Sequence, residues 1–308
     1  MPQSPHGWIG DTAPIEARQE TPLIAVPNVS EGRDAATLDA IGAAFTDAGA
    51  RLLNRHEDPD HHRAVYTLAA APGALAPALV AGAREAVARI DVNTPRGAHP
   101  HVGAIDVVPV VHVTDALRGA ACAEALVVAS DLADELDLPV FLYGELAGGR
   151  SRAELRSGGI ERLAQRMASG ELAADFGPQA PHPSAGATLV AARPPLVAFN
   201  VELAPPASFA DARRIAEEIR EGGAAGLAGV RAIAVELTSR GGTPQVSTNI
   251  EDPAAVPLAE VVEAVRRHVA VLAAEIVGLV PRAALEGFPE DVALPGFEAS
   301  RQVIEDLI

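Results

Sequence analysis

Two similar apolar stretches decide the fold: Pro22-Leu-Ile-Ala-Val-Pro-Asn-Val29 and Pro195-Leu-Val-Ala-Phe-Asn-Val201. With a one-residue slip between them, both read as short buried strands bounded by turn-forming residues. Each stretch is followed by segments that favour the order helix, strand, strand, helix, which is typical of a split βαβ, or ferredoxin-like, unit. We therefore favour an internal duplication, and a chance similarity of two apolar strands is the competing interpretation.

The rest of the chain supplies the other elements of these two units. In the first half, apolar spacing predicts helices that begin after Asp34 and Pro72 and span 119–136, and strands over 51–53, 64–68, 105–113 and 140–143. In the second half, it predicts a helix capped by Asp211, strands over 230–237 and 245–249, and one long helix over 258–276. Two such units would place a ligand cleft between their sheets.

The composition excludes several kinds of chemistry. All 24 basic side chains of this 308-residue chain are arginines, so no lysine is present. A GxxxxGK[ST] phosphate loop, a kinase-type lysine and a pyridoxal-phosphate Schiff base are therefore impossible. The net charge of -17 disfavours nucleic acid and anionic membranes as partners, and it requires local arginines around any anionic ligand.

The chain carries no sign of secretion or membrane insertion. Cys122 is the only cysteine, so no disulfide can form within the chain. No stretch of 18 uncharged apolar residues exists, and residues 1–21 lack the basic start and apolar core of a signal peptide. We expect a cytoplasmic protein whose residues 1–21 form a loose N-terminal extension.

Histidines gather in two segments. The first, His56-Glu-Asp-Pro-Asp-His-His-Arg63, has metal-binding residue types, but it lacks HExxH or HxH spacing and contains a turn-forming Asp-Pro-Asp. We favour a solvated turn or substrate loop there and assign no metal. In the second, Gly97 and Gly103 frame His99, which titrates near neutral pH and is a candidate general acid/base. An inert surface histidine is the alternative.

A proline-rich segment lies between the two halves. Residues 175–187 read Asp-Phe-Gly-Pro-Gln-Ala-Pro-His-Pro-Ser-Ala-Gly-Ala, with three prolines and few charges. The segment is too stiff for a flexible coil. A linker and a shaped loop over a ligand both remain open.

Ordered strings along the chain resemble the glutamate formimidoyltransferase family, which also forms the N-terminal half of the bifunctional formimidoyltransferase-cyclodeaminase. The resemblance runs from about Pro22 to the C-terminus, and its strings are Val26-Pro-Asn-Val-Ser-Glu-Gly32, Arg63-Ala-Val-Tyr-Thr67, Gly97-Ala-His-Pro-His-Val-Gly-Ala-Ile-Asp106, Pro139-Val-Phe-Leu-Tyr-Gly-Glu145, Asp175-Phe-Gly-Pro178, Ala198-Phe-Asn200, Gln245-Val-Ser-Thr-Asn249 and Val277-Gly-Leu-Val-Pro281. No cyclodeaminase half follows, so we expect the stand-alone form.

The resemblance implies an α+β fold and an activity. The fold would be two ferredoxin-like (split βαβ) subdomains, 22–193 and 194–308, with facing antiparallel sheets, outer helices and a substrate tunnel between them. The enzyme would move the formimidoyl group from N-formimidoyl-L-glutamate to N5 of tetrahydrofolate, its co-substrate, in histidine degradation. A homodimer is also implied.

The resemblance also implies site residues. His99 falls on the family's catalytic histidine, which would take the proton from N5 and return it to the departing nitrogen. The family's folate-contacting loop corresponds to Gly177, Pro178, Gln179, Ala180, Pro181, His182, Pro183, Ser184, Ala185 and Gly186. Arginines beside matched strings are candidates for binding the substrate carboxylates: Arg63, Arg96, Arg193 and Arg240.

Three histidines depart from the family pattern. His101 replaces a frequent arginine, His56 an aspartate of some members, and His62 an asparagine. Because His101 lacks the two parallel hydrogen bonds that an arginine gives a carboxylate, the identity of the formimidoyl donor is open. Formimidoylglycine or another formyl donor is therefore one alternative, and a folate-binding protein without catalysis is another. A metal-dependent hydrolase built on 56–63 is a third.

Overall fold

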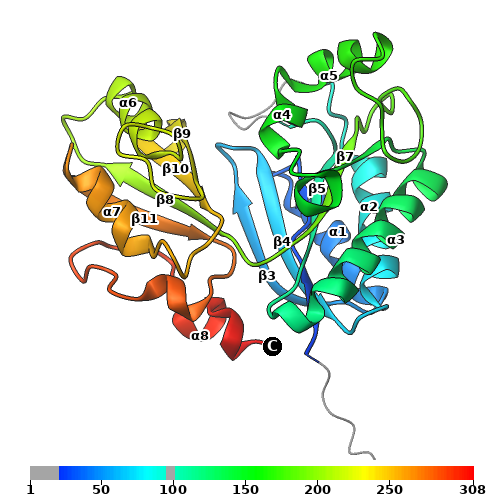
Figure 1. Ribbon diagram of the computed structural model, residues 1–308, viewed down its shortest axis with the longest axis horizontal. Helices are drawn as coiled ribbons and strands as arrows, with labels where there is room; N and C mark the ends of the chain where they lie inside the picture. Colours follow the sequence, from blue (N-terminus) through cyan, green and yellow to red (C-terminus); the bar gives the residue numbers. More distant parts are fainter. Residues whose placement is uncertain (1–20, 95–100) are drawn as a thin grey trace, which may run out of the picture.

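Two lobes, each built on its own β-sheet, make up the described part of the chain (Figure 1). The computed structural model describes residues 21–94 and 101–308. The predicted extension 1–21 thus lies almost entirely outside the described residues. Among the described helices, none is long and apolar enough to cross a membrane.

The N-terminal lobe holds a mixed sheet. Its strands lie in the order β3, β4, β1 with β2, β5, β7, β6, with bounds β1 (Leu23–Ala25), β2 (Asn28–Val29), β3 (Arg51–Asp58), β4 (Arg63–Ala70), β5 (Ile105–Val111), β6 (Val140–Leu142) and β7 (Thr188–Arg193). Both β1 and β2 pair antiparallel with β4 and with β5, so they act as one interrupted strand. The helices are α1 (Ala35–Asp47), α2 (Leu75–Arg89), α3 (Arg118–Leu136), α4 (Arg152–Arg156) and α5 (Gly159–Ala168), with the 3-10 turns η1 (Asp115–Leu117) and η2 (Gly144–Ala147).

The expectation of antiparallel sheets is wrong for one side of this lobe. Strand β7 runs parallel to both β5 and β6. The chain passes through α3 between β5 and β6, and through α4 and α5 between β6 and β7. Helical crossovers of this kind return the chain in the same direction, whereas antiparallel neighbours need only a turn.

Strand alternation gives the N-terminal sheet two different faces. One face buries Leu23, Tyr66 and Val108 against α1, α2 and α3 in the main core. Helix α1 begins just after Asp34, as predicted, and the Asp34 carboxylate caps it by accepting a hydrogen bond from the Ala36 amide. Residues on the opposite face of β4, such as Arg63 and Val65, point toward the second lobe and line cavities there.

The C-terminal lobe has an antiparallel sheet covered by helices on one side. Its strands lie in the order β11, β8, β10, β9, with bounds β8 (Val197–Leu203), β9 (Val230–Leu237), β10 (Thr243–Ile250) and β11 (Val271–Val277). The helices are α6 (Phe209–Ile219), α7 (Leu258–Arg266) and α8 (Ala299–Gln302), with the 3-10 turns η3 (Thr238–Arg240), η4 (Arg282–Leu285) and η5 (Ile304–Asp306). Helices α6 and α7 pack on the sheet to form the second core.

Two predictions for this lobe are wrong. The long helix over 258–276 ends at Arg266, and Val271–Val277 is strand β11, which pairs with the central strand β8. The helical pattern required Leu272 to be buried, but its exposed fraction is 51%. A short run of Val, Leu and Ile fits the periodicity of a helix as well as that of a strand. The pairing with β8 decides that this run is a strand. The cap of α6 is Ser208, and Asp211 completes its capping box three residues later.

The two lobes share one connectivity at their centres. Taking β1 with β2 as the first strand, the N-terminal order β5, β1/β2, β4, β3 matches the C-terminal order β11, β8, β10, β9. In both, one helix follows the first strand and another precedes the last. Figure 1 shows α2 and α3 at the outer edge of one lobe, α7 at the outer edge of the other, and the sheets between them.

Two groups of contacts hold the lobes together. Ile304 packs with Ile24, Val111 and Leu279 in a small apolar cluster that joins the two lobes. The carboxylate of Asp60, in the β3–β4 turn, accepts hydrogen bonds from the Thr238 hydroxyl at 2.8 Å and the Ser239 amide at 3.0 Å. These contacts fix the width of the space between the sheets.

Candidate active site

A cavity of about 580 Å³ lies between the lobes. This volume falls in the range of small-molecule sites, which commonly form at domain interfaces. Its N-terminal wall comes from β3, β4 and α4, and its C-terminal wall from β8 to β11 and the turn after α6; the charged and polar lining residues are His56, Asp58, His61, Arg63, Ser151, Arg152, Arg156, Ser157, Asn200, Arg220, Glu221, Arg231, Ser247, Thr248, Asn249 and Glu251.

Arginines concentrate around this cavity although the whole chain is acidic. Arg156 pairs with Asp106, and Arg231 pairs with Glu221 at 3.1 Å and with Glu251 at 3.2 Å. Within residues 21–94 and 101–308, neither Arg152 nor Arg220 forms an ion pair. Arg152 instead lies over the Tyr143 ring, 5.7 Å from its centroid. These two guanidinium groups, one from each lobe, are placed to bind carboxylates.

Arg63 is the candidate arginine that the structure brings to the cavity. Its position on β4 turns it toward the second lobe, and burial lowers its pKa to about 9, with the nearby charge of Arg156 adding to the effect. The side chain remains charged at neutral pH. It also borders a smaller space shared with His61, His62 and His101.

The other candidate arginines lie elsewhere. Arg193, at the end of β7, borders a neighbouring cavity of about 490 Å³, and burial lowers its pKa to about 10. Arg240 pairs with the buried carboxylate of Glu202 and is not among the described residues that line the interlobe cavity. Arg96 lies outside the described residues. Sequence position beside a matched string was therefore a weak guide to cavity location.

The segment 56–63, expected as a solvated turn or substrate loop, is a turn only in its middle. His56 and Asp58 lie on strand β3, and only the residues after Asp58 form the turn into β4. Burial lowers the pKa of His56, which Glu275 and Asp58 offset only in part. Burial raises the pKa of Asp58, but the hydrogen bond and charge of His61 outweigh this, so the pKa lies below its ordinary value.

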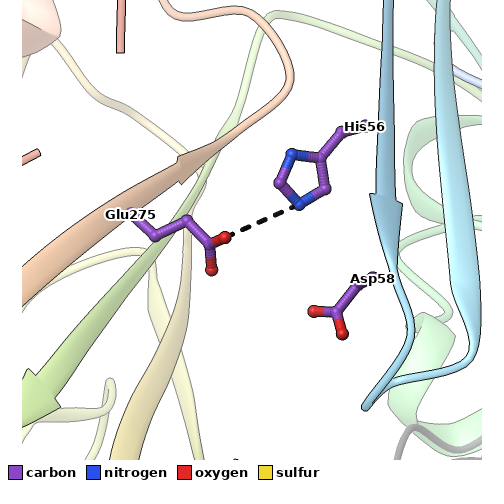
Figure 2. A group of neighbouring side chains, drawn as sticks. All are labelled: His56, Asp58 and Glu275. Carbon is purple, nitrogen blue, oxygen red and sulfur yellow. Dashed lines mark ion pairs between the residues drawn. The ribbon is translucent and has the colours of Figure 1, made fainter. Parts of the chain in front are cut away.

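Glu275, on β11 of the other lobe, lies close to His56 of this strand. Its Oε1 lies 3.8 Å from His56 Nε2 (Figure 2). Its Oε2 accepts a hydrogen bond of 3.0 Å from the Asn200 amide on β8. Sequence reasoning missed Glu275 as a functional residue. The available signal was a single carboxylate that interrupts the apolar run 269–280.

His62 has a structural role next to the site. The Gly32 amide donates to its Nδ1 at 3.1 Å, and Glu31 Oε1 lies 3.3 Å from the same nitrogen. Only 6% of His62 is exposed, and its φ of 51° lies in the left-handed region. This histidine therefore ties the Ser30–Gly32 turn to the β3–β4 turn.

The predicted folate loop, Gly177–Gly186, is held in one shape by hydrogen bonds. Its His182 Nδ1 accepts from the Ala185 amide at 3.0 Å, and the Ser184 carbonyl accepts from the Val92 amide at 2.9 Å. Gly103 pairs with the loop so closely that a Cβ there would lie 1.8 Å from the Ala187 carbonyl oxygen. None of the loop's residues is among the described residues that line the interlobe cavity.

The structure settles the linker interpretation of this segment. Residues 175–187 precede β7 and belong to the N-terminal lobe, whereas the chain crosses to the second lobe between Arg193 and Val197. A linker at 175–187 is therefore wrong. The predicted catalytic residue His99 lies outside the described residues.

Comparison with known proteins is consistent with this architecture. The sequence model "Formiminotransferase domain, N-terminal subdomain" matches residues 23–193, and "Formiminotransferase domain" matches 198–288. Formimidoyltransferase-cyclodeaminase of Rattus norvegicus is 37% identical over 278 residues, which cover 84% of this chain and 50% of that protein. This chain thus spans about half the length of the bifunctional relatives.

Two relatives match along nearly their whole length. Glutamate formimidoyltransferase of Streptococcus pyogenes serotype M1 is 33% identical over 291 residues, which cover 91% of this chain and 96% of that protein. The protein of that name from Thermoplasma acidophilum is 32% identical over 271 residues, which cover 84% and 88%. Both subdomain models and both full-length relatives agree, and the chain belongs to the formiminotransferase family.

Proposed function

We propose that the protein is a glutamate formimidoyltransferase that moves the formimidoyl group from N-formimidoyl-L-glutamate to N5 of tetrahydrofolate, a step of histidine degradation. The observation that carries this proposal is the arginine-lined cavity of about 580 Å³ between the lobes, in a chain with full-length relatives of that name. Tetrahydrofolate is the co-substrate in this reaction.

The charges around the cavity suit the two substrates. Both substrates carry glutamate carboxylates, and Arg63, Arg152 and Arg220 present guanidinium groups from both lobes. Planar guanidinium binds carboxylate through two parallel hydrogen bonds, which fixes orientation as well as position. Since the chain as a whole carries a net charge of -17, this local cluster is what would hold two anions in one cavity.

The reaction needs one group that both accepts and donates a proton. N5 of the folate attacks the formimidoyl carbon and forms a new C–N bond, and N5 loses its proton. The bond from that carbon to the glutamate nitrogen then breaks, and this nitrogen gains a proton. We propose His99 for both transfers, since an imidazole titrates near neutral pH. Binding both substrates side by side supplies a further proximity effect.

We propose that the loop Gly177–Gly186 contacts the folate. The internal hydrogen bonds of the loop support this role, because a loop with a fixed shape loses little conformational entropy on binding. The loop lies beside Val92 and Gly103, which flank the segment that contains His99. We infer that the folate ring reaches this loop while its glutamate lies among the arginines.

We also infer that both lobes are ferredoxin-like units that arose by duplication, with subdomains 22–193 and 194–308. The matched strand order at the centre of each lobe supports this inference. The homodimer and the cytoplasmic location stay predictions.

A transfer assay with purified protein tests the proposed function. Formimidoylglutamate and formimidoylglycine are compared as donors with tetrahydrofolate as acceptor, and 5-formimidoyltetrahydrofolate is measured. Turnover with formimidoylglutamate well above formimidoylglycine is expected. The reverse preference would assign the other donor, and tight folate binding without product from either donor would contradict an enzymatic role.

A further inference from the structure

We propose that His56, Asp58 and Glu275 form a binding site for a divalent transition-metal ion of the Zn²⁺ type between the two lobes. Each residue offers one ligand atom, and these atoms all lie within 4.8 Å of one another. The proposal differs from the expectation from sequence, which assigned no metal to the segment 56–63. It does not rest on the transfer activity, whose chemistry as written above uses no metal.

Strand geometry brings the three side chains together. His56 and Asp58 are two residues apart on β3, so both side chains project from the same face of the strand. Glu275 comes from β11 in the other sheet, and Figure 2 shows its carboxylate directed at the His56 ring with Asp58 alongside. The His56 Nε2 to Glu275 Oε1 distance is 3.8 Å. Ligands about 2.0–2.1 Å from a tetrahedral Zn²⁺ are about 3.4 Å apart. The His56–Glu275 pair is therefore close to this spacing, and the remaining pairs, within 4.8 Å of one another, would have to close further around the ion.

The surroundings orient the ligand atoms. The Asn200 amide donates to Glu275 Oε2 at 3.0 Å, which leaves Oε1 facing His56. The backbone amides of Asp60 and His61 donate to Asp58 Oδ1 at 2.9 Å each, and the His61 ring bonds to Oδ2. Metal ligands in proteins are typically held by outer hydrogen bonds of this kind.

The His56 nitrogen and the local charge also suit a metal ion. His56 Nε2 is buried and has no hydrogen-bond partner among the described residues. A neutral imidazole there presents a lone pair, and the two carboxylates supply two negative charges that a dication balances. One imidazole with two carboxylates suits Zn²⁺ better than Ca²⁺, which prefers six or more oxygen ligands.

The site would leave one coordination position open toward the cavity. His56 and Asp58 both line that cavity, and three protein ligands with a water or substrate in the fourth position are typical of catalytic zinc sites. Because Glu275 belongs to one lobe and the other two ligands to the other, a bound ion would hold the lobes at a fixed separation. The competing interpretation is a simple His56–Glu275 ion pair without metal.

Calorimetric titration of the chelator-treated, full-length protein with ZnCl₂ tests the proposal, without folate or donor present. We expect one equivalent of Zn²⁺ to bind, and Ca²⁺ not to compete with it. His56→Asn and Glu275→Gln are expected to abolish this stoichiometric binding, and Asn200→Ala to weaken it by about 10–100-fold. His268→Asn is the matched control, since His268 also faces a carboxylate, Glu218 at 3.4 Å, but outside the three-residue group.

Cobalt substitution keeps the test independent of whether the variants fold. Visible absorption of the wild-type protein with Co²⁺ is expected to show the intense bands of a four- or five-coordinate site. Weak bands of a six-coordinate, water-like ion, no stoichiometric binding, or equal Zn²⁺ binding by the control and the ligand variants would each overturn the proposal. Because the readout is metal bound rather than product formed, an inactive protein that binds Zn²⁺ contradicts only the transferase assignment.

Discussion

The two lobes share a central strand order but differ in what surrounds it. The N-terminal lobe extends its sheet with β7 and β6 and adds α4 and α5 on the face that looks toward the cavity. The C-terminal lobe keeps only the four central strands in its described residues, with helices on one face. The same core therefore supports two different walls of one cavity.

This difference divides the labour at the site. The longer lobe supplies Arg63 and Arg152 to the cavity lining, whereas the shorter lobe supplies Asn200, whose amide also holds the Glu275 carboxylate on the neighbouring strand. Neither lobe by itself encloses the cavity or completes the group shown in Figure 2. Both lobes are therefore needed to build the site.

The largest expected effect is on His99, the proposed proton-transfer residue, which belongs to the N-terminal half of the chain. We expect His99→Ala to lower the transfer rate by about 10²–10⁴-fold, since the variant lacks the acid and base for both proton transfers. Steady-state turnover and tetrahydrofolate binding would be measured together, with His268→Ala as a surface-histidine control. Near wild-type turnover of the His99 variant would falsify the assignment, whereas lost folate binding would point to a positioning role.

Matched core substitutions test whether the lobes are separate folding units. Phe45 in the N-terminal core and Phe199 in the C-terminal core are both fully buried. Replacing either by Ala is expected to lower the free energy of unfolding by about 3–5 kcal/mol, because the cavity left behind relaxes only in part. Denaturant unfolding with hydrogen exchange would show faster exchange mainly in the substituted lobe. Uniform acceleration across both lobes would show a single cooperative unit instead.

The two cavity arginines without ion pairs test whether both walls bind the substrates. Arg152→Gln and Arg220→Gln are each expected to raise KM by about 10- to 150-fold with little change in kcat, because each removes a charged hydrogen bond to a carboxylate. Arg301→Gln, on α8 and 76% exposed in its side chain, is the control. If only one variant responds, the carboxylates bind to one lobe alone.

Added salt is a second check on the same arginines. Screening shortens the reach of charge, so KM is expected to rise with ionic strength in the wild-type protein and to rise less in the two arginine variants. A KM that stays flat from low to high salt would count against the arginine cluster as the binding element.

The smallest expected difference lies in how each lobe caps its first helix. Thr37 donates a hydrogen bond that lowers the pKa of Asp34, the cap of α1. The stabilisation is therefore present above the ordinary pKa of 3.8 and lost as pH falls through the lower folded value. Asp34→Asn should be slightly less stable at pH 7 and equal to wild type in strong acid. Ser208→Ala should cost about 0.5–2 kcal/mol at neutral pH. Because the Ser208 hydroxyl lowers the pKa of Asp211, part of this cost should also disappear in acid, and thermal unfolding from pH 2 to 7 would check both variants.

Local patterns in the sequence were reliable where one interpretation was possible. Asp34 before an apolar helical face is a cap, and strand β4 follows from the unbroken run after Arg63. They failed where two periods fit the same residues, as in 258–276, or where two acceptors could cap one helix, as at Ser208 and Asp211. In the first case, pairing with a distant strand decided the secondary structure, and in the second, a hydrogen bond to a nearby amide decided which residue is the cap.

The candidate site was less accessible to sequence reasoning. Arg63 was found because it sits beside a recognisable string, but Arg152 and Arg220 lie in ordinary polar segments with no local signal. Arg240, which was chosen because it also sits beside a recognisable string, forms an ion pair with Glu202 instead. Proximity in the chain does not report which face of a strand points toward the second lobe.

The sequence by itself determined the chemistry that is absent and the family. Without lysine, no Schiff base or lysine phosphate loop can form, and ordered strings over the chain predicted a family that two subdomain models and full-length relatives then confirmed. Only the tertiary structure decided that His56 and Asp58 lie on a strand facing Glu275, and that Arg152 and Arg220 meet at one cavity. The reason is physical: side chains from separate lobes approach one another through sheet packing, strand alternation and interlobe contacts, none of which is encoded in the spacing of neighbouring residues.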